Sequence, residues 1–315
     1  MKERQSHQFG RLITAAVTPF DEKGKLDIEG TKRLTSHLME TGTDSVVHAG
    51  TTGESPNLKE RERMLGLQAT LEATRDRGLV IAGTSTYSTA ESVKLSRLAQ
   101  QEGAHGLLLV TPYYNSPDQE GMFRHFAAIA EAVDIPCILY NVPSRTSRNL
   151  LPVTVLRLDR EFENIIGLKE AIGTSDEKGR QQVEEIIAAK SEGFEVWSGN
   201  DQDTLTILRM GGFGVVSVGS HLVGSYIKEM IRAHRAGEDG RAQSLHDYLM
   251  PFFAALFPPK SPRPSPSAVK AMLSIVGLPA GDLRLPVVAE PESYQVYLRN
   301  LLGHYNLMPT GGEYE

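Results

Sequence analysis

The amino-acid sequence predicts an α/β protein: a closed (β/α)8 barrel, or TIM barrel, followed by a C-terminal helical extension. Three observations favour this fold. Short β-rich runs recur about every 30 residues, segments of helical period lie between them, and the runs number eight. Alternating strand and helix implies parallel pairing, because a parallel connection needs a crossover. Eight units favour a closed barrel over an open doubly wound sheet, which is the alternative.

Each strand is expected where aliphatic and β-branched residues cluster. The eight runs are Leu12–Val17, Ser45–Ala49, Leu79–Gly83, Gly106–Val110, Cys137–Tyr140, Ile165–Lys169, Glu195–Ser198 and Gly214–Val218. The helical patterns between them include Lys59–Arg77, Glu91–Gln101, Gln119–Val133 and Glu177–Lys190. Residues 88–91 have the spacing of a capping box, and Pro152 suits the first turn of a helix, where its missing N–H is harmless.

The chain after the eighth strand is expected to be mainly helical. The candidate helices are Ile227–Ala236, Arg241–Leu256, Ala268–Val276 and Ser293–Leu302. A proline-rich segment, residues 258–266, predicts a stiff surface loop, with a ligand for a proline-binding module as the alternative. We therefore expect a barrel over residues 10–224, a helical region over 225–302 and a flexible tail over 303–315.

Composition excludes several classes of protein. The net charge of -6 gives no general attraction to nucleic acid or to anionic membranes. The N-terminus lacks the apolar stretch of a signal peptide and no apolar segment is long enough to span a bilayer, so we expect a cytoplasmic protein. The one cysteine, Cys137, lies in an apolar run and is interpreted as a buried structural thiol.

Lys169 is the most informative residue, because it ends the apolar run of the sixth strand. An ammonium in apolar surroundings loses its hydration, and burial lowers a lysine's pKa until the neutral amine can attack a ketone. The alternatives are a lysine that leaves its strand into solvent or one that pairs with a carboxylate such as Glu170. Polar residues at the ends of the other strands favour the reactive lysine, since barrels carry their chemistry at that rim.

The periodicity of the strands brings a tyrosine to the lysine. Ile165, Gly167 and Lys169 are expected to share one face of their strand, as are Ile138 and Tyr140 on the neighbouring strand. If these faces point inward, the tyrosine can relay protons to and from the lysine. Further hydroxyls stand at other strand ends, on Thr51, Thr52 and Tyr114, and backbone N–H groups of residues 50–55 suit a carboxylate.

Other chemistries fit the sequence poorly. The loop at residues 50–55 lacks the lysine of a Walker A motif, and Gly212-Phe213-Gly214 precedes a strand instead of following one. The histidines show no metal-ligand spacing. His48 is interpreted as a core or supporting residue, whereas His221 stands just past the eighth strand and could reach the rim.

Five ordered motifs carry a family resemblance. They are Gly50-Thr51-Thr52-Gly53-Glu54-Ser55, Thr111-Pro112-Tyr113-Tyr114-Asn115, residues 139–146 (LYNVPSRT), Gly167-Leu168-Lys169-Glu170-Ala171 and Gly214-Val215-Val216-Ser217-Val218. Together they resemble the dihydrodipicolinate synthase/N-acetylneuraminate lyase superfamily, and most closely its dihydrodipicolinate synthase members. The resemblance extends from about residue 10 to residue 302.

The resemblance implies roles for the matching residues. Lys169 is similar to the lysine that forms a Schiff base with pyruvate, and Tyr140, Thr52 and Tyr114 to the proton-relay triad, with Thr51 as a neighbour. Thr51, Thr52 and the backbone of Val216 would bind the pyruvate carboxylate. The tyrosine matching Tyr114 reaches the adjacent subunit in that family, which implies at least a dimer and usually a homotetramer.

The resemblance also implies the reaction. Arg145 is similar to the arginine that binds the carboxylate of L-aspartate 4-semialdehyde, so the implied activity is a lyase that condenses this substrate with pyruvate to 4-hydroxy-tetrahydrodipicolinate. No metal or separate cofactor is implied. The alternatives are a lyase or aldolase for N-acetylneuraminate or a 2-keto-3-deoxy sugar acid, and a non-catalytic barrel that binds a small keto acid.

Four positions bear on how far the family pattern extends. Asn200 stands where the family often has aspartate, and we expect little effect. Arg63 and Tyr87 replace a histidine and an asparagine of members that lysine inhibits, although Glu91 fits that inhibitor site. We expect inhibition by lysine to be weak or absent.

Overall fold

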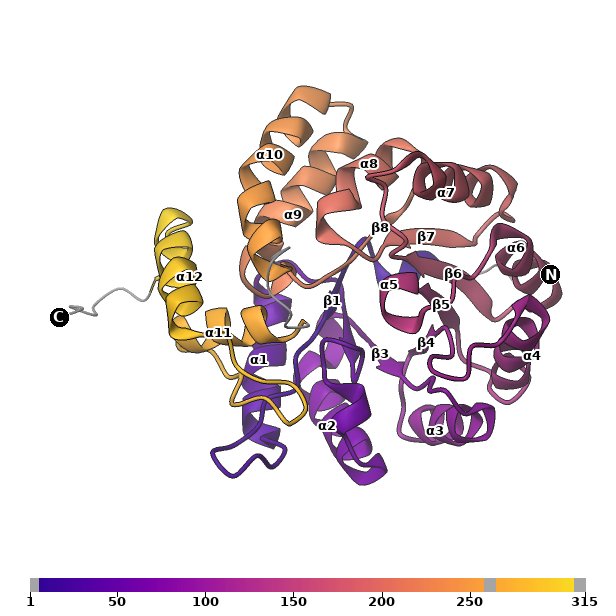
Figure 1. The fold of residues 1–315 in the computed structure, drawn as a ribbon, viewed down its shortest axis with the longest axis horizontal. Helices are drawn as coiled ribbons and strands as arrows, with labels where there is room; N and C mark the ends of the chain where they lie inside the picture. The colour runs from indigo at the N-terminus through magenta and orange to yellow at the C-terminus, as the bar shows by residue number, and fades with distance from the viewer. Residues whose placement is uncertain (1–5, 258–264, 309–315) are drawn as a thin grey trace.

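A closed barrel of eight parallel strands forms the centre of the molecule (Figure 1). The computed structural model describes residues 6–257 and 265–308. The strands are β1 (Leu12–Ala15), β2 (Ser45–His48), β3 (Leu79–Gly83), β4 (Gly106–Val110), β5 (Cys137–Asn141), β6 (Ile165–Glu170), β7 (Glu195–Ser198) and β8 (Gly214–Ser217). Each strand pairs with the next one in the chain, and β8 closes the barrel by pairing with β1. The predicted fold class is confirmed, with strand ends within two residues of those expected.

Helices surround the barrel and continue beyond it (Figure 1). They are α1 (Ile28–Glu40), α2 (Glu60–Thr74), α3 (Thr89–Gln101), α4 (Gln119–Ala130), α5 (Pro143–Thr146), α6 (Pro152–Glu161), α7 (Glu177–Ala189), α8 (Thr204–Arg209), α9 (Ser220–Arg235), α10 (Asp239–Leu256), α11 (Ser267–Ile275) and α12 (Glu292–His304). No helix in the described part of the chain is both long and apolar enough to cross a membrane.

Local sequence accounts for several helix ends. The Ser88 side chain accepts a hydrogen bond from the backbone N–H of Glu91 and so begins α3, as expected of an N-cap. Pro152 occupies the first turn of α6. Helix α2 is shorter than its periodic pattern because Arg75 takes a positive φ of 50° and the chain continues as a 3-10 turn.

Two apolar layers form the core around the strands. The residues inside the barrel include Ile13, Val47, Ile81, Leu108, Ile138, Trp197 and Val216. Their neighbours in the chain point outward and pack beneath the helices, as Leu12, Val46, Val80, Leu107, Val196 and Val215 do. Where a strand is regular, this alternation directs every second side chain into the barrel, which is the arrangement that the rim residues need.

Strand β6 departs from strict alternation. Cys137 pairs with Ile165 but Ile138 pairs with Gly167, so one extra residue is accommodated at this point. Ile166 therefore packs inside the barrel and Ile165 outside, and the expectation that Ile165 shares a face with Lys169 is wrong. Gly167 allows close approach of β7, because a Cβ there would clash with the backbone carbonyl oxygen of Glu195 and lie 2.6 Å from the indole Cζ3 of Trp197.

The C-terminal helices lie against one side of the barrel, next to α1 and α9 (Figure 1). Helix α9 runs directly on from β8 across position 224, where we placed the boundary between barrel and helical region. Residues 1–5, 258–264 and 309–315 lie outside the described part of the chain, and with them most of the proline-rich segment and most of the expected tail.

Candidate active site

Lys169 lies on β6 between Tyr140 of β5 and Trp197 of β7. It is only 4% exposed, and its Nζ atom lies 4.2 Å from the centroid of the Tyr140 ring. Burial lowers the pKa of Lys169 to about 7, with Arg145 lowering it further and Asp201 raising it. About half of the lysine side chains are therefore neutral near pH 7, which is the form that attacks a carbonyl carbon.

Glu170 does not pair with Lys169, because successive residues of a strand point to opposite faces. Its carboxylate accepts hydrogen bonds at 3.0 and 3.1 Å from Asn141, at 3.2 Å from Gln182 and at 2.8 Å from the N–H of Ile172. Burial raises the pKa of Glu170 to about 7. Since Asn141 and Glu170 directly follow Tyr140 and Lys169, this contact holds β5 and β6 in register behind the lysine and the tyrosine.

Asp201 is a site residue that the sequence reasoning passed over. It is 3% exposed and accepts hydrogen bonds from the Ser217 hydroxyl and, at 3.0 Å each, from the N–H groups of Val218 and Gly219. Burial raises the pKa of its carboxyl, and those hydrogen bonds and the charge of Lys169 lower it. A carboxylate three residues after the end of β7 is a usable signal in the sequence.

The threonine loop, residues 50–55, follows β2. Thr52 is 5% exposed and Thr51 is partly buried. Burial raises the pKa of Tyr140, whereas Arg145 and a hydrogen bond with the Thr51 side chain lower it. The hydroxyl that contacts Tyr140 is thus that of Thr51, which the family resemblance gave as the neighbour of a relay triad containing Thr52.

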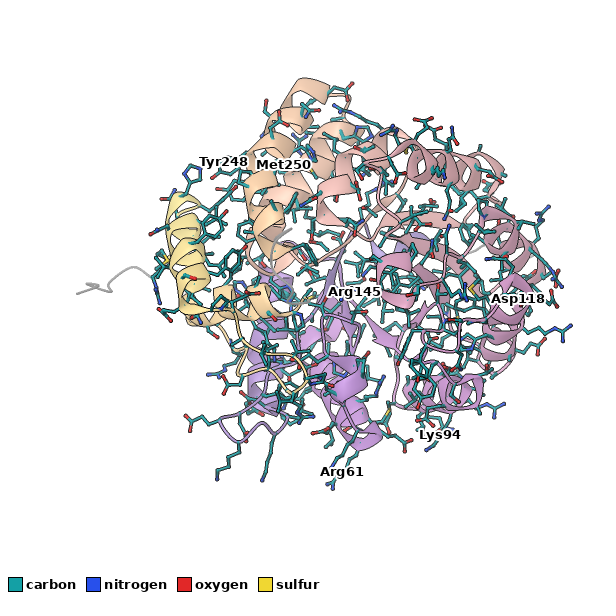
Figure 2. All side chains as sticks on the ribbon, viewed as in Figure 1. Arg61, Lys94, Asp118, Arg145, Tyr248 and Met250 are labelled. Atoms are coloured by element: carbon teal, nitrogen blue, oxygen red, sulfur yellow. The ribbon has the colours of Figure 1, made fainter. Side chains whose placement is uncertain are left out.

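Three further predicted site residues, Arg145, Val216 and Tyr114, differ in how exposed their side chains are. Arg145 lies on α5 with an exposed side chain, near the centre of the view in Figure 2, and its charge acts on both Lys169 and Tyr140. Val216 is 1% exposed and belongs to the apolar interior of the barrel beside β1. Tyr114 is 91% exposed and has a positive φ of 69°, so its hydroxyl stands away from the interior of its own chain.

The two candidate histidines, His48 and His221, use their ring nitrogens in hydrogen bonds to backbone groups. His48 bonds to the carbonyl of Arg63 at 3.0 Å, and burial lowers the pKa of its ring to about 4. His221 accepts from the N–H of Val17 at 3.1 Å and bonds to the carbonyl of Val218 at 2.7 Å. It is fully buried and supports the loop after β1 instead of reaching the rim. No group of three metal-binding side chains occurs within residues 6–257 and 265–308.

The rim of the closed barrel carries a lysine of lowered pKa beside a tyrosine and threonines. These are the groups of an enzyme that works through a Schiff base. Comparison with known proteins assigns the family. Residues 8–305 match the Dihydrodipicolinate synthetase family, and the chain belongs to it. The resemblance found in the five motifs is thereby confirmed.

Relatives and solved structures cover nearly the whole chain. The chain is 46% identical over 300 residues to a 4-hydroxy-tetrahydrodipicolinate synthase of Symbiobacterium thermophilum, with 95% of this chain and 99% of the relative covered. It is similar to a dihydrodipicolinate synthase of Bacillus anthracis, with a TM-score of 0.88, 41% identity and coverage of 94% and 98%. A Cyanidioschyzon merolae enzyme with lysine bound gives a TM-score of 0.91 at 38% identity, covering 96% of this chain and 100% of that one.

Proposed function

We propose that the protein condenses pyruvate with L-aspartate 4-semialdehyde to form 4-hydroxy-tetrahydrodipicolinate, on the route to diaminopimelate and lysine. The observation that carries the proposal is Lys169, a buried amine with a pKa of about 7 that lies 4.2 Å from the Tyr140 ring. Relatives that are 42–47% identical to the chain carry the name 4-hydroxy-tetrahydrodipicolinate synthase, which supports this substrate pair.

The reaction begins when the neutral amine of Lys169 attacks the ketone carbon of pyruvate and water is lost, which leaves an imine. The imine withdraws electrons, so a methyl proton leaves and an enamine forms. The enamine carbon attacks the aldehyde of the second substrate, whose oxygen takes up a proton and becomes a hydroxyl group. The amino group of the adduct then attacks the imine carbon, closes the ring and releases Lys169. The lysine itself provides the electron sink, so the proposed reaction needs no metal or separate cofactor.

Tyr140 is the proposed proton relay for these steps. It neighbours Lys169 in register, and its hydroxyl contacts Thr51, so a proton has a path from the reacting carbon towards the threonine loop. Thr51 and Thr52 would also bind the pyruvate carboxylate, together with the backbone of Val216. The exposed Tyr114, with its strained φ, fits a side chain that completes the relay in an adjacent subunit.

Arg145 is proposed to bind the carboxylate of the second substrate. Its guanidinium is exposed at the mouth of the barrel, and its charge reaches both Lys169 and Tyr140. A planar, bidentate cation suits a small amino-acid carboxylate better than the hydroxyls of a sugar acid. We further propose that the protein is a cytoplasmic homotetramer, a dimer of dimers. Each subunit would consist of a barrel over residues 10–224 and a helical region over residues 225–302.

Borohydride trapping tests the covalent step. The protein is incubated with pyruvate, reduced and digested, and the expected result is one adduct on Lys169 that is absent from Lys169→Met. A chain that takes up no pyruvate would refute the proposal. Turnover of pyruvate with L-aspartate 4-semialdehyde is then compared with cleavage of N-acetylneuraminate and of a 2-keto-3-deoxy sugar acid, and faster cleavage of a sugar acid would assign the other branch of the superfamily.

A further inference from the structure

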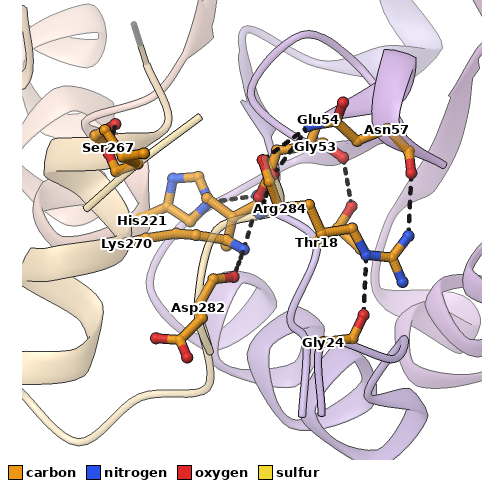
Figure 3. A network of polar contacts seen from close by, with 12 residues as sticks. Thr18, Gly24, Gly53, Glu54, Asn57, His221, Ser267, Lys270, Asp282 and Arg284 are labelled. Atoms are coloured by element: carbon orange, nitrogen blue, oxygen red, sulfur yellow. Dashed lines mark hydrogen bonds and ion pairs between the residues drawn. The ribbon is translucent and has the colours of Figure 1, made fainter. Parts of the chain in front are cut away.

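The threonine loop is tied to the C-terminal part of the chain by a buried network of polar contacts (Figure 3). Within this loop, Glu54 follows Thr51-Thr52-Gly53 and takes a left-handed φ of 54°. This conformation is strained for a residue other than glycine, so the surroundings of Glu54 must hold it in place. The contacts that hold it come mainly from residues 270–284.

Lys270 of α11 forms the centre of this network. Its Nζ atom lies 2.8 Å from the Glu54 carboxylate, and the side chains of both residues are almost fully buried, at 2% and 1% exposed. The same amine donates to the carbonyl of Asp282 at 2.9 Å and lies 4.3 Å from the centroid of the Phe20 ring. Removing one partner of a buried ion pair leaves an uncompensated charge, which is far more costly than losing an exposed pair.

Arg284 anchors the other oxygen of Glu54. Its backbone N–H donates to Glu54 at 3.0 Å, and its guanidinium donates to the carbonyls of Gly24 and Asn57 at 2.9 and 3.0 Å. A bidentate contact with Glu62, at 2.6 and 2.9 Å, fixes the guanidinium against α2. Arg284 also lies 4.1 Å from the ring of Phe20, so two cations lie within reach of one aromatic ring of the loop after β1.

Further contacts connect Glu54 to the backbone of the threonine loop. The carbonyl of Gly53 accepts a hydrogen bond at 2.6 Å from the Thr18 hydroxyl, and the N–H of Glu54 donates to the carbonyl of Thr51 at 3.1 Å. The position of Glu54 therefore determines where the backbone of Thr51 and Thr52 lies. Within residues 6–257 and 265–308, no hydrogen bond, ion pair or ring contact joins Lys270 or Arg284 to Lys169 or Tyr140.

We propose that Lys270 and Arg284 are positioning residues of the active site, which act through Glu54 to hold the Thr51 and Thr52 backbone where it binds the carboxylate of the keto acid. The C-terminal helices are then part of the substrate site. The inference rests on the proposed function, because it assigns the threonine loop to pyruvate binding. A displacement of about 1 Å in such a loop can cost about 100-fold in rate.

The test compares full-length Lys270→Met with Lys228→Met. Both changes remove a lysine from an ion pair, but Lys228 is half exposed and pairs with Asp44, away from the threonine loop. Pyruvate KM, kcat, the pH profile of borohydride trapping and thermal unfolding are measured for each variant below its unfolding temperature. For Lys270→Met we expect a KM for pyruvate that rises at least about 10-fold, with the pH midpoint of trapping unchanged. For Lys228→Met we expect values within about twofold of the unaltered protein.

A second variant keeps the test decisive if Lys270→Met does not fold. Glu54→Gln removes the charge at nearly the same size, and the double variant Glu54→Gln/Lys270→Met buries no unpaired charge, so it should recover part of the lost pyruvate affinity. Folded variants whose pyruvate KM matches that of the unaltered protein would overturn the positioning role. An unaltered protein that traps no pyruvate would overturn the proposed function, and this inference with it.

Discussion

The pH dependence of pyruvate trapping should report the environment of Lys169 directly. Burial brings the pKa of Lys169 to about 7 from its ordinary value of 10.5. At pH 8 about 90% of these amines are neutral, compared with about 0.3% for an unperturbed lysine, a difference of about 300-fold in reactive form. The trapping rate should therefore rise tenfold per pH unit below about pH 7 and level off above it.

Two substitutions should move this midpoint in opposite directions. Asp201 raises the pKa of Lys169 and Arg145 lowers it. Asp201→Asn should therefore shift the midpoint to lower pH, and Arg145→Gln should shift it to higher pH.

The assay measures initial rates of borohydride trapping between about pH 5.5 and 9.5, with the adduct on Lys169 quantified by mass spectrometry. Saturating pyruvate separates the titration of the amine from any loss of affinity caused by Arg145→Gln. A rate that keeps rising tenfold per unit through pH 9 would refute the burial argument. Shifts of both variants in the same direction would refute the assignment of the two charges.

Three further outcomes are expected. Millimolar lysine should leave turnover near its uninhibited value, because the buried guanidinium of Arg63 already lies close enough to Glu91 to be stabilised by its charge; strong inhibition in a titration would contradict this. Gly167→Ala should destabilise the protein by about 1–3 kcal/mol in urea unfolding, since the new methyl group would meet the backbone carbonyl oxygen of Glu195 and the ring of Trp197, and an unchanged urea midpoint would contradict this. Cys137, whose pKa burial raises to about 12, should react with a thiol reagent only after denaturation, and labelling of the native protein would contradict its burial.

Local patterns were sufficient to predict the barrel and the pairing of Tyr140 with Lys169. The eight aliphatic runs marked the strands, and alternation from Ile138 placed Tyr140 beside Lys169, as the register confirms. The same alternation failed at Ile165, because β6 accommodates one extra residue at this point and the hydrophobic pattern of the sequence does not reveal it. Pattern reasoning assumes regular geometry, so irregular residues escape it.

Contacts between distant segments could not be predicted from local patterns. Glu54 and Arg284 are 230 positions apart, and nothing around either residue indicates the other. The same holds for Asp201, since the N–H groups that bind its carboxylate belong to Val218 and Gly219, directly after β8. The family resemblance supplied roles for residues at the rim, but it gave no account of the residues that hold the rim in place.

The 230-residue separation between Glu54 and Arg284 also determines how long the ribosome takes to reach Arg284 after it has added Glu54. A ribosome adding 5–20 residues per second needs about 10 to 50 s to make the chain between them. Throughout this interval Glu54 has neither the backbone donor of Arg284 nor, until Lys270 is made, its ionic partner. A nascent chain can therefore carry all eight strands and Lys169 before the ionic and backbone partners of Glu54 exist. If Lys270 and Arg284 position the threonine loop as proposed, completion of the C-terminal region would be the event that prepares the newly made protein for its substrate.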